Sequence, residues 1–149
     1  MKILILLPYL PHENVPHAGG RFTYNLLKAL GKRNELYAIT FINNRNERNN
    51  LAKARQSFKE LAKVNLTYYD KLINFIISPW LPVRFAFRFS PVFMFRLFKY
   101  RKKNIDVVIM DHSILGAYAF ILRIIFPKAA IIWNMVELSS SSRKRKLQI

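Results

Sequence analysis

The chain has 149 residues, the length of one domain, and it contains no cysteine, so disulfides and thiolate metal sites are excluded. Lys and Arg number 25 against 8 Asp and Glu, and the formal net charge of +17 indicates an anionic partner, either a nucleic acid or an anionic membrane surface. A chain that is merely basic and soluble is the alternative. The histidines, His12, His17 and His112, are too few and too scattered to suggest a zinc site, and no metal is expected.

The first apolar run briefly looks like a signal peptide, because Lys2 precedes residues 3–7 (ILILL). However, Pro8 and Pro11 follow at once, and there is no small-residue cleavage site. Arginines break up every later apolar stretch well short of the roughly 20 residues that a membrane span needs. We therefore expect no transmembrane helix.

Residues 3–7 are instead typical of a central parallel strand that is covered on both faces. Residues 8–20 contain three prolines and two glycines and predict a loop. Apolar residues recur at helical spacing from Phe22 to Leu30, and Gly31 is expected to end that helix as a left-handed cap. Residues 36–42 (LYAITFI) predict a second strand.

The middle of the chain is less strongly patterned. Residues 43–50 (NNRNERNN) are polar and are expected to be exposed. A basic helix is expected from about Leu51 to Lys63, followed by a short third strand over residues 64–69. Residues 106–110 (DVVIM) form another run of buried-strand type and predict a fourth strand.

The last elements repeat the alternation of helix and strand. Residues 114–126 predict an apolar helix that Pro127 ends, and residues 129–133 predict a fifth strand. Strands alternating with helices predict an α/β, doubly wound fold with a mostly parallel, Rossmann-like sheet of about five strands. In such sheets ligands bind beyond the carboxyl ends of the strands, where residues 17–20, 111–113 and 134–139 are expected to converge.

The adjacent glycines Gly19 and Gly20 precede the expected first helix. A helix N-terminus carries partial positive charge that suits a phosphate, and glycine lets a ligand approach the main chain. The dinucleotide motif G-x-G-x-x-G and the P-loop are both absent from the chain. An ordinary turn before a helix is the alternative interpretation.

The stretch KILILLPYLP, a loop ending in HAGG and a helix of the RFTYNLLKAL kind together resemble the N-terminal domain of family 4 glycosyltransferases. The resemblance continues with DVVIMDHS and with IIWNMVELSS, which is similar to the strand and loop that often read H-N-V-E in this family. It spans residues 1–140 as an incomplete domain, with residues 141–149 as a basic tail or truncation point. The middle third matches only in pattern.

The resemblance implies the GT-B architecture, in which two Rossmann-like domains enclose the active site. It implies that the glycine-rich loop, His17, Gly19, Gly20 and Arg21, faces the diphosphate and sugar of a nucleotide-sugar donor. No metal or other cofactor is implied, because backbone and cationic side chains supply the positive charge.

The resemblance also implies an acceptor side at His112, Asn134 and Glu137. Asn134 stands where the family has its histidine, and Met135 where it has its asparagine, so an acid–base role for that histidine does not carry over. The alternatives are that His112 caps the next helix and that Glu137 is a helix cap.

A basic, aromatic segment lies between Asp70 and Asp106, with no acidic residue inside it. Prolines at 79, 82 and 91 are expected to divide it into short helices. Its composition favours an anionic membrane surface. The residues expected at that surface are Arg84, Arg88, Arg96, Lys99, Arg101, Lys102 and Lys103.

Other interpretations of this segment stay open. Some aromatics could form core beneath a solvated basic face, and Phe85, Phe87 and Phe89 alternate as a strand would. Single-stranded nucleic acid would suit the same composition, but no nucleic-acid module is recognisable and no nucleic-acid partner is expected.

The expected function is that of the acceptor-side domain of a retaining glycosyltransferase (hexosyltransferase type). It would act with a nucleotide-sugar donor on a cell-envelope glycan or lipid-linked acceptor, as in lipopolysaccharide and polysaccharide biosynthesis. The expected location is cytoplasmic, peripheral on the inner face of the cell membrane. Because the C-terminal donor-binding domain is absent from these residues, the chain is expected to be inactive alone, as a fragment, a truncated gene or half of a split enzyme. A non-catalytic membrane-surface subunit that completes or recruits a partner enzyme, such as a separate donor-binding chain, is the alternative.

Overall fold

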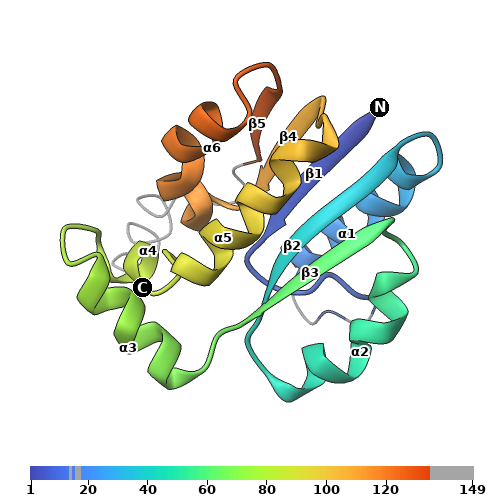
Figure 1. The fold of residues 1–149 in the computed structure, drawn as a ribbon. Coiled ribbons are helices and arrows are strands. Elements are labelled where there is room, and N and C mark those ends of the chain that lie inside the picture. The colour runs from blue at the N-terminus through green and yellow to red at the C-terminus, as the bar shows by residue number, and fades with distance from the viewer. Residues whose placement is uncertain (14, 16–17, 135–149) are drawn as a thin grey trace, which may run out of the picture.

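The computed structural model describes residues 1–13, 15 and 18–134 (Figure 1). Within these residues, five parallel strands form one sheet in the order β3-β2-β1-β4-β5. The predicted α/β, doubly wound fold is thereby confirmed. The strands are β1 (Lys2–Leu7), β2 (Glu35–Ile42), β3 (Glu60–Asn65), β4 (Val107–Asp111) and β5 (Ala130–Asn134).

Helices cover both faces of the sheet (Figure 1). One face carries α1 (Ala18–Gly31) and α2 (Arg45–Arg55). The other face carries α5 (Pro91–Tyr100), the 3₁₀ helix η2 (Ser113–Tyr118) and α6 (Ala119–Ile125). The remaining helices are α3 (Tyr68–Ile77), α4 (Val83–Ala86) and the 3₁₀ helix η1 (Arg101–Lys103).

Strand β1 is buried from Ile3 to Leu7 because it supplies side chains to both layers. Ile3, Ile5 and Leu7 pack with α1 and α2, whereas Leu4 and Leu6 pack with α5, η2 and α6. Successive side chains of a strand point to opposite faces, so a central strand must be apolar at every position. This requirement explains the continuous apolar run at the start of the sequence.

The prediction for residues 43–69 is wrong in its element bounds. Residues 45–50 are mostly exposed, as expected, but they form the first half of α2, whose start was expected at about Leu51, and β3 begins four residues earlier than predicted. The cause is local capping: the Asn44 side chain accepts from the Glu47 backbone N–H at 2.9 Å, and the Glu47 carboxylate accepts from the Asn43 N–H at 2.7 Å. These bonds satisfy backbone donors at the helix start and outweigh the polar composition.

The expected left-handed cap at Gly31 is also wrong, because no glycine of the chain has a positive φ. Helix α1 instead tightens at its end, where the N–H groups of Lys32 and Arg33 donate to carbonyls three residues earlier at 3.4 and 3.3 Å. The Asn34 side chain donates to the Leu30 carbonyl at 3.0 Å. Two kinds of bond therefore satisfy the last carbonyls without a special glycine conformation.

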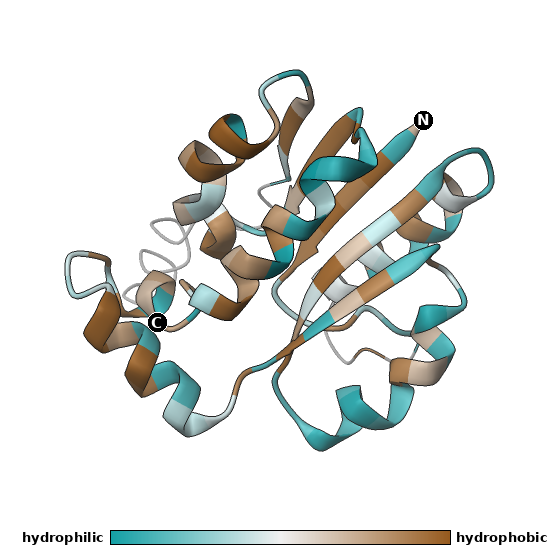
Figure 2. Ribbon diagram, in the orientation of Figure 1, coloured by the Kyte–Doolittle hydropathy of each residue, from teal (hydrophilic) through white to brown (hydrophobic). Residues whose placement is uncertain are grey.

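The basic, aromatic segment forms short helices, as its prolines predict, and α3, α4 and α5 succeed one another along it. The strand interpretation of Phe85, Phe87 and Phe89 is wrong, because residues 83–86 are helical. The apolar run 114–126 is divided into η2 and α6. Figure 2 shows hydrophobic residues over much of α3 and α6. No helix in the described part of the chain is long and apolar enough to cross a membrane.

Candidate functional site

The carboxyl ends of β1 and β4 lie side by side at the centre of the sheet, where the strand order reverses. Chains leaving two such strands diverge to opposite faces and leave a crevice, which is where ligands bind in open α/β sheets. The polar residues that converge at this edge come from the β1–α1 loop, α1, β4 and β5.

Asp111, the last residue of β4, is the centre of a buried hydrogen-bond network. The Thr23 hydroxyl from α1 donates to Asp111 Oδ2 at 2.8 Å, and the Asn134 amide from β5 donates to Asp111 Oδ1 at 2.8 Å. The Tyr9 hydroxyl makes a third side-chain hydrogen bond to the same carboxyl group. The network therefore connects four segments of the chain at the carboxyl edge of the sheet.

Burial raises the pKa of Asp111 above its ordinary value, because a charged carboxylate loses its water there. The hydrogen bonds from Thr23, Asn134 and Tyr9 oppose this rise, because they stabilise the charged form. Burial also raises the pKa of Tyr9 to about 12, so its hydroxyl stays protonated and remains a donor at neutral pH. Since its oxygens are already engaged, Asp111 acts here as a group that fixes α1 relative to β4 and β5.

The glycine pair lies inside α1 rather than before it, because the helix begins at Ala18. Gly20 is buried and Gly19 half-buried, and the first turn contains no acidic residue. The N-terminus of α1 thus brings partial positive charge to the carboxyl edge of the sheet. The expected loop position is wrong, whereas the Thr23–Asp111 bond places α1 at the carboxyl edge of the sheet, at the end of β4.

Arg21 is exposed, and its guanidinium turns back along the chain, where Nε donates to the Val15 carbonyl at 3.2 Å. This contact stabilises the end of the β1–α1 loop. Two of the sequence-predicted site residues, His17 and Glu137, lie outside the described residues.

His112 follows β4 directly and has an unusual backbone, with φ 85° and ψ 143°. A non-glycine residue in this region carries about 1–3 kcal/mol of strain, and such residues cluster at functional sites. Its backbone N–H donates to the Asn134 carbonyl at 2.8 Å, and its carbonyl accepts from the Trp133 indole at 3.4 Å. Contacts to β5 therefore help to hold the strained conformation.

The His112 ring caps η2, because Nδ1 accepts from the Ile114 backbone N–H at 3.3 Å. The capping alternative for this residue is thus observed. An accepting Nδ1 also places the proton of the neutral ring on Nε2.

Sequence reasoning missed Asp111 as the organising group and overlooked Thr23 and Tyr9 entirely. A signal for Asp111 was present, because it is the first polar residue after the apolar run 107–110 and the strand ends there. Thr23 carried no such signal, since a threonine one turn into a helix is common and its partner lies 88 residues away.

The expected membrane-surface residues divide into two groups. Arg88 is half-buried, and its Nε is enclosed with no hydrogen-bond partner among the described residues. Burial lowers the pKa of its guanidinium, and the negative charge of Glu47 opposes that shift. Arg96 is half-buried as well. The others are exposed: Arg84, Lys99, Arg101, Lys102 and Lys103. Arg88 therefore differs from the exposed group in both burial and electrostatic partner.

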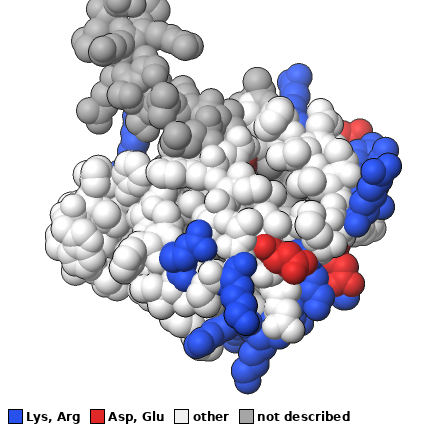
Figure 3. Space-filling view, turned by 90° about the horizontal axis from the view of Figure 1, so that it is seen from above, with Lys and Arg blue, Asp and Glu red and all other residues white. Residues whose placement is uncertain are grey.

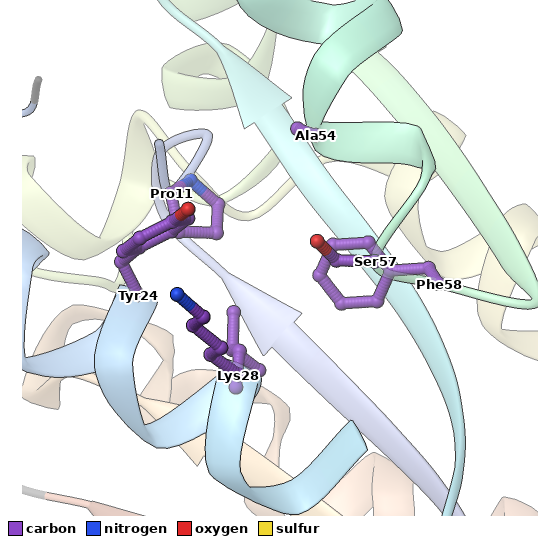
Figure 4. Close-up of a pocket in the computed structure, with 7 residues that line it drawn as sticks. Pro11, Tyr24, Lys28, Ala54, Ser57 and Phe58 are labelled. Atoms are coloured by element: carbon purple, nitrogen blue, oxygen red, sulfur yellow. The ribbon is translucent and has the colours of Figure 1, made fainter. Parts of the chain in front are cut away.

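A small pocket of about 100 Å³ lies apart from this site, between α1 and the end of α2 (Figure 4). Tyr24 and Lys28 from α1 face Ser57 and Phe58 across it, with Pro11 at one end. Pockets that hold drug-sized ligands are usually about 300–1,000 Å³, so this one is too small for a nucleotide-sugar.

Comparison of the chain with protein-family models, with curated proteins and with solved structures yields no match.

Proposed function

We propose that this chain is the acceptor-side domain of a retaining, GT-B type glycosyltransferase. The observation that carries the proposal is the meeting of the α1 N-terminus, the Asp111 network and the strained His112 where the strand order reverses. Support also comes from the resemblance of residues 2–30, 106–113 and 131–140 to family 4 glycosyltransferases in the order and spacing of their motifs.

The proposed reaction moves a sugar from a nucleotide donor to a hydroxyl of a cell-envelope glycan or lipid-linked acceptor. The bond from the anomeric carbon to the diphosphate breaks, and the nucleoside diphosphate leaves with the bonding electrons. The acceptor oxygen forms its bond on the same face of the sugar, and its proton passes to the leaving diphosphate oxygen.

The residues have separate roles in this proposal. The N-terminus of α1, with Gly19 and Gly20, would stabilise the negative charge that develops on the diphosphate. His112 would line the acceptor side, and Asp111 would position α1 and Asn134. Neither a metal nor another cofactor is required. The nucleotide would be held by a second α/β domain, and the membrane partner would be the inner face of the cell membrane.

Glycine amide resonances provide a direct test, because the chain contains only four glycines. Addition of a nucleotide-sugar such as UDP-glucose or GDP-mannose to the ¹⁵N-labelled chain should shift the amides of Gly19 and Gly20. Gly31 lies at the other end of α1 and serves as an internal control. The nucleoside alone should have no such effect, because it lacks the diphosphate.

Unchanged Gly19 and Gly20 signals across a panel of millimolar nucleotide-sugars and inorganic pyrophosphate would contradict the donor-facing role. The second candidate function, a non-catalytic membrane-surface subunit, is favoured by the exposed apolar residues of α3. It predicts silent glycine amides together with retained binding to lipid vesicles.

A further inference from the structure

Helix α3 has an inverted distribution of polar and apolar side chains. Asn74 is the buried residue of this helix, and its side-chain amide donates to the Phe87 carbonyl at 3.0 Å. The carbonyl of Asn74 in turn accepts from the buried Ser78 hydroxyl at 2.6 Å. The bond from Asn74 to Phe87 and an edge-to-face contact between Phe75 and Phe87 thus connect α3 to the end of α4, whereas the Ser78 bond closes the end of α3 itself.

The outward side of the helix is apolar. Its residues recur at spacings of three, one, three, one and three, which places the helical ones on a single stripe. Ile76 is 66% exposed and Trp80, just after the helix, is 70% exposed. This α3 surface comprises Tyr69, Leu72, Ile73, Ile76, Ile77 and Trp80, all of them exposed.

A helix that faces water usually directs such a stripe toward the core. A contiguous exposed apolar patch marks an interaction site, because leaving it in water has no compensating gain for the folded domain. α3 packs mainly against α4 and stands away from the sheet (Figure 1), so no other described element covers its outer side.

The charges near the α3 surface restrict the chemistry of that partner. No acidic residue occurs between Asp70 and Asp106, whereas Lys71 lies on α3 and the exposed Arg84 on α4. On a different face of the domain, seen from above Figure 1, Lys and Arg gather at one side with Asp and Glu among them (Figure 3). A partner with anionic groups beside an apolar layer fits this arrangement, and the surface of an anionic bilayer has both.

The aromatic residues agree with a bilayer rather than with a dry protein groove. Tyr68 and Tyr69 at the helix start are each 76% exposed, and Trp80 stands at the other end. Tyrosine and tryptophan are enriched at the headgroup level of membranes, because each ring has an apolar body and a polar end. We propose that the α3 surface docks on an anionic lipid bilayer, with α3 lying in the plane of the interface.

This inference takes the membrane partner of the proposed function as its premise, but it does not depend on sugar transfer. It also moves the main contact from the basic residues of α5 and η1 to α3. The basic residues then attract the domain to the membrane, and the α3 surface provides the apolar contact that orients it.

Co-sedimentation with vesicles tests the proposal through a matched pair of variants. Ile76→Glu on α3 and Ile124→Glu on α6 are the same substitution at two exposed isoleucines. The native side chains are 66% and 62% exposed. Both lower the net charge by the same amount. On vesicles of phosphatidylcholine and phosphatidylglycerol, I76E should bind about tenfold more weakly or worse, whereas I124E should bind as the native chain does.

Tryptophan emission gives a second readout. Vesicles should shift the emission of Trp80 to the blue, because the indole enters a less polar environment. The W80F variant, in which Trp133 is retained, should lack this shift. Because Ile76 is mostly exposed, far-UV circular dichroism should show the same helix content in I76E as in the native chain.

Equal losses of vesicle binding in I76E and I124E would overturn the proposal, since charge alone would then explain binding. If the native chain self-associates in the absence of vesicles and I76E abolishes that association, the occupant of the α3 surface is a second copy of the chain and the proposal is overturned. Binding to oligonucleotides but not to vesicles would do the same. Vesicle binding that depends on Ile76, together with silent Gly19 and Gly20 amides, would support docking while sugar transfer fails.

Discussion

The hydrogen bond between Thr23 and Asp111 leads to a quantitative prediction for Thr23→Val. Valine keeps the shape of threonine but replaces the hydroxyl that lies 2.8 Å from Asp111 Oδ2, at a site where the two residues are 1% and 2% exposed. A hydrogen bond to a charged group contributes about 1.5–3 kcal/mol, and we expect T23V to lower the free energy of unfolding by that amount at neutral pH.

The loss should depend on pH, with a sign set by Asp111. Burial raises its folded-state pKa, so its contribution to stability is fully present below the unfolded pKa and is lost as the pH rises through the folded pKa. The Thr23 bond opposes that loss, and removing the bond raises the folded pKa further. Below the unfolded pKa the carboxyl is neutral, and the cost of T23V should fall to about 0.5–1.5 kcal/mol.

Urea unfolding followed by circular dichroism at about pH 7 and about pH 3 measures both quantities. Thr40→Val is the matched control, because Thr40 is fully buried and its hydroxyl donates to the neutral Phe41 carbonyl at 3.1 Å. Its cost should be about 0.5–1.5 kcal/mol at both pH values. Equal, pH-independent costs in T23V and T40V would refute the bond to Asp111.

Two further substitutions test packing around the site. Tyr118→Phe removes a buried hydroxyl that accepts from the Ser90 N–H at 2.8 Å and donates to the Arg88 carbonyl at 2.6 Å. The free energy of unfolding should therefore fall by about 1–3 kcal/mol. An unchanged urea midpoint would contradict this. Gly116→Ala would place a Cβ 2.5 Å from the Trp133 ring and should cost about 1–3 kcal/mol and alter the near-UV spectrum. Gly31→Ala is its control, because the nearest side-chain atom lies at 3.4 Å and helical alanine should add about 0.4–1 kcal/mol.

Apart from β3, which begins four residues before its predicted start, the strands were the most predictable part of the fold. β1 is apolar from Ile3 to Leu7 because both faces are covered there, and the expected bounds of β4 and β5 differ from the observed ones by one residue at each end. Burial on both faces produces a continuous apolar run, a pattern that loops and surface helices do not have. β5 is nevertheless half exposed, which its apolar sequence did not indicate.

Helix α2 was missed because its composition and its capping disagree. Residues 43–50 are almost entirely polar, yet Asn44 and Glu47 stand three residues apart, as in a capping box. The three-residue spacing of Asn44 and Glu47, rather than the polar composition of the segment, would have predicted the start of α2. Glu47 is also buried, although charged side chains are rarely so.

At the site, convergence of the loops at the carboxyl edge followed from the order of elements, whereas the contacts within it did not. The Thr23–Asp111 bond depends on how α1 is rotated about its axis, and residues 88 positions apart give no local pattern. The inverted burial of α3 was equally hidden, because apolar spacing identifies the stripe of a helix but not whether that stripe faces the core.

The order of the strands has a consequence for the chain as it leaves the ribosome. β1 pairs with β2 on one side and with β4 on the other, and the residues between Ile42 and Val107 separate those two events. At about 5–20 residues per second, one edge of the central strand waits for several seconds beside an already paired neighbour. A nascent chain that stalls before β4 should therefore be the species that chaperones recognise. Pairing of β4 with β1 should then cover the exposed edge of the central strand.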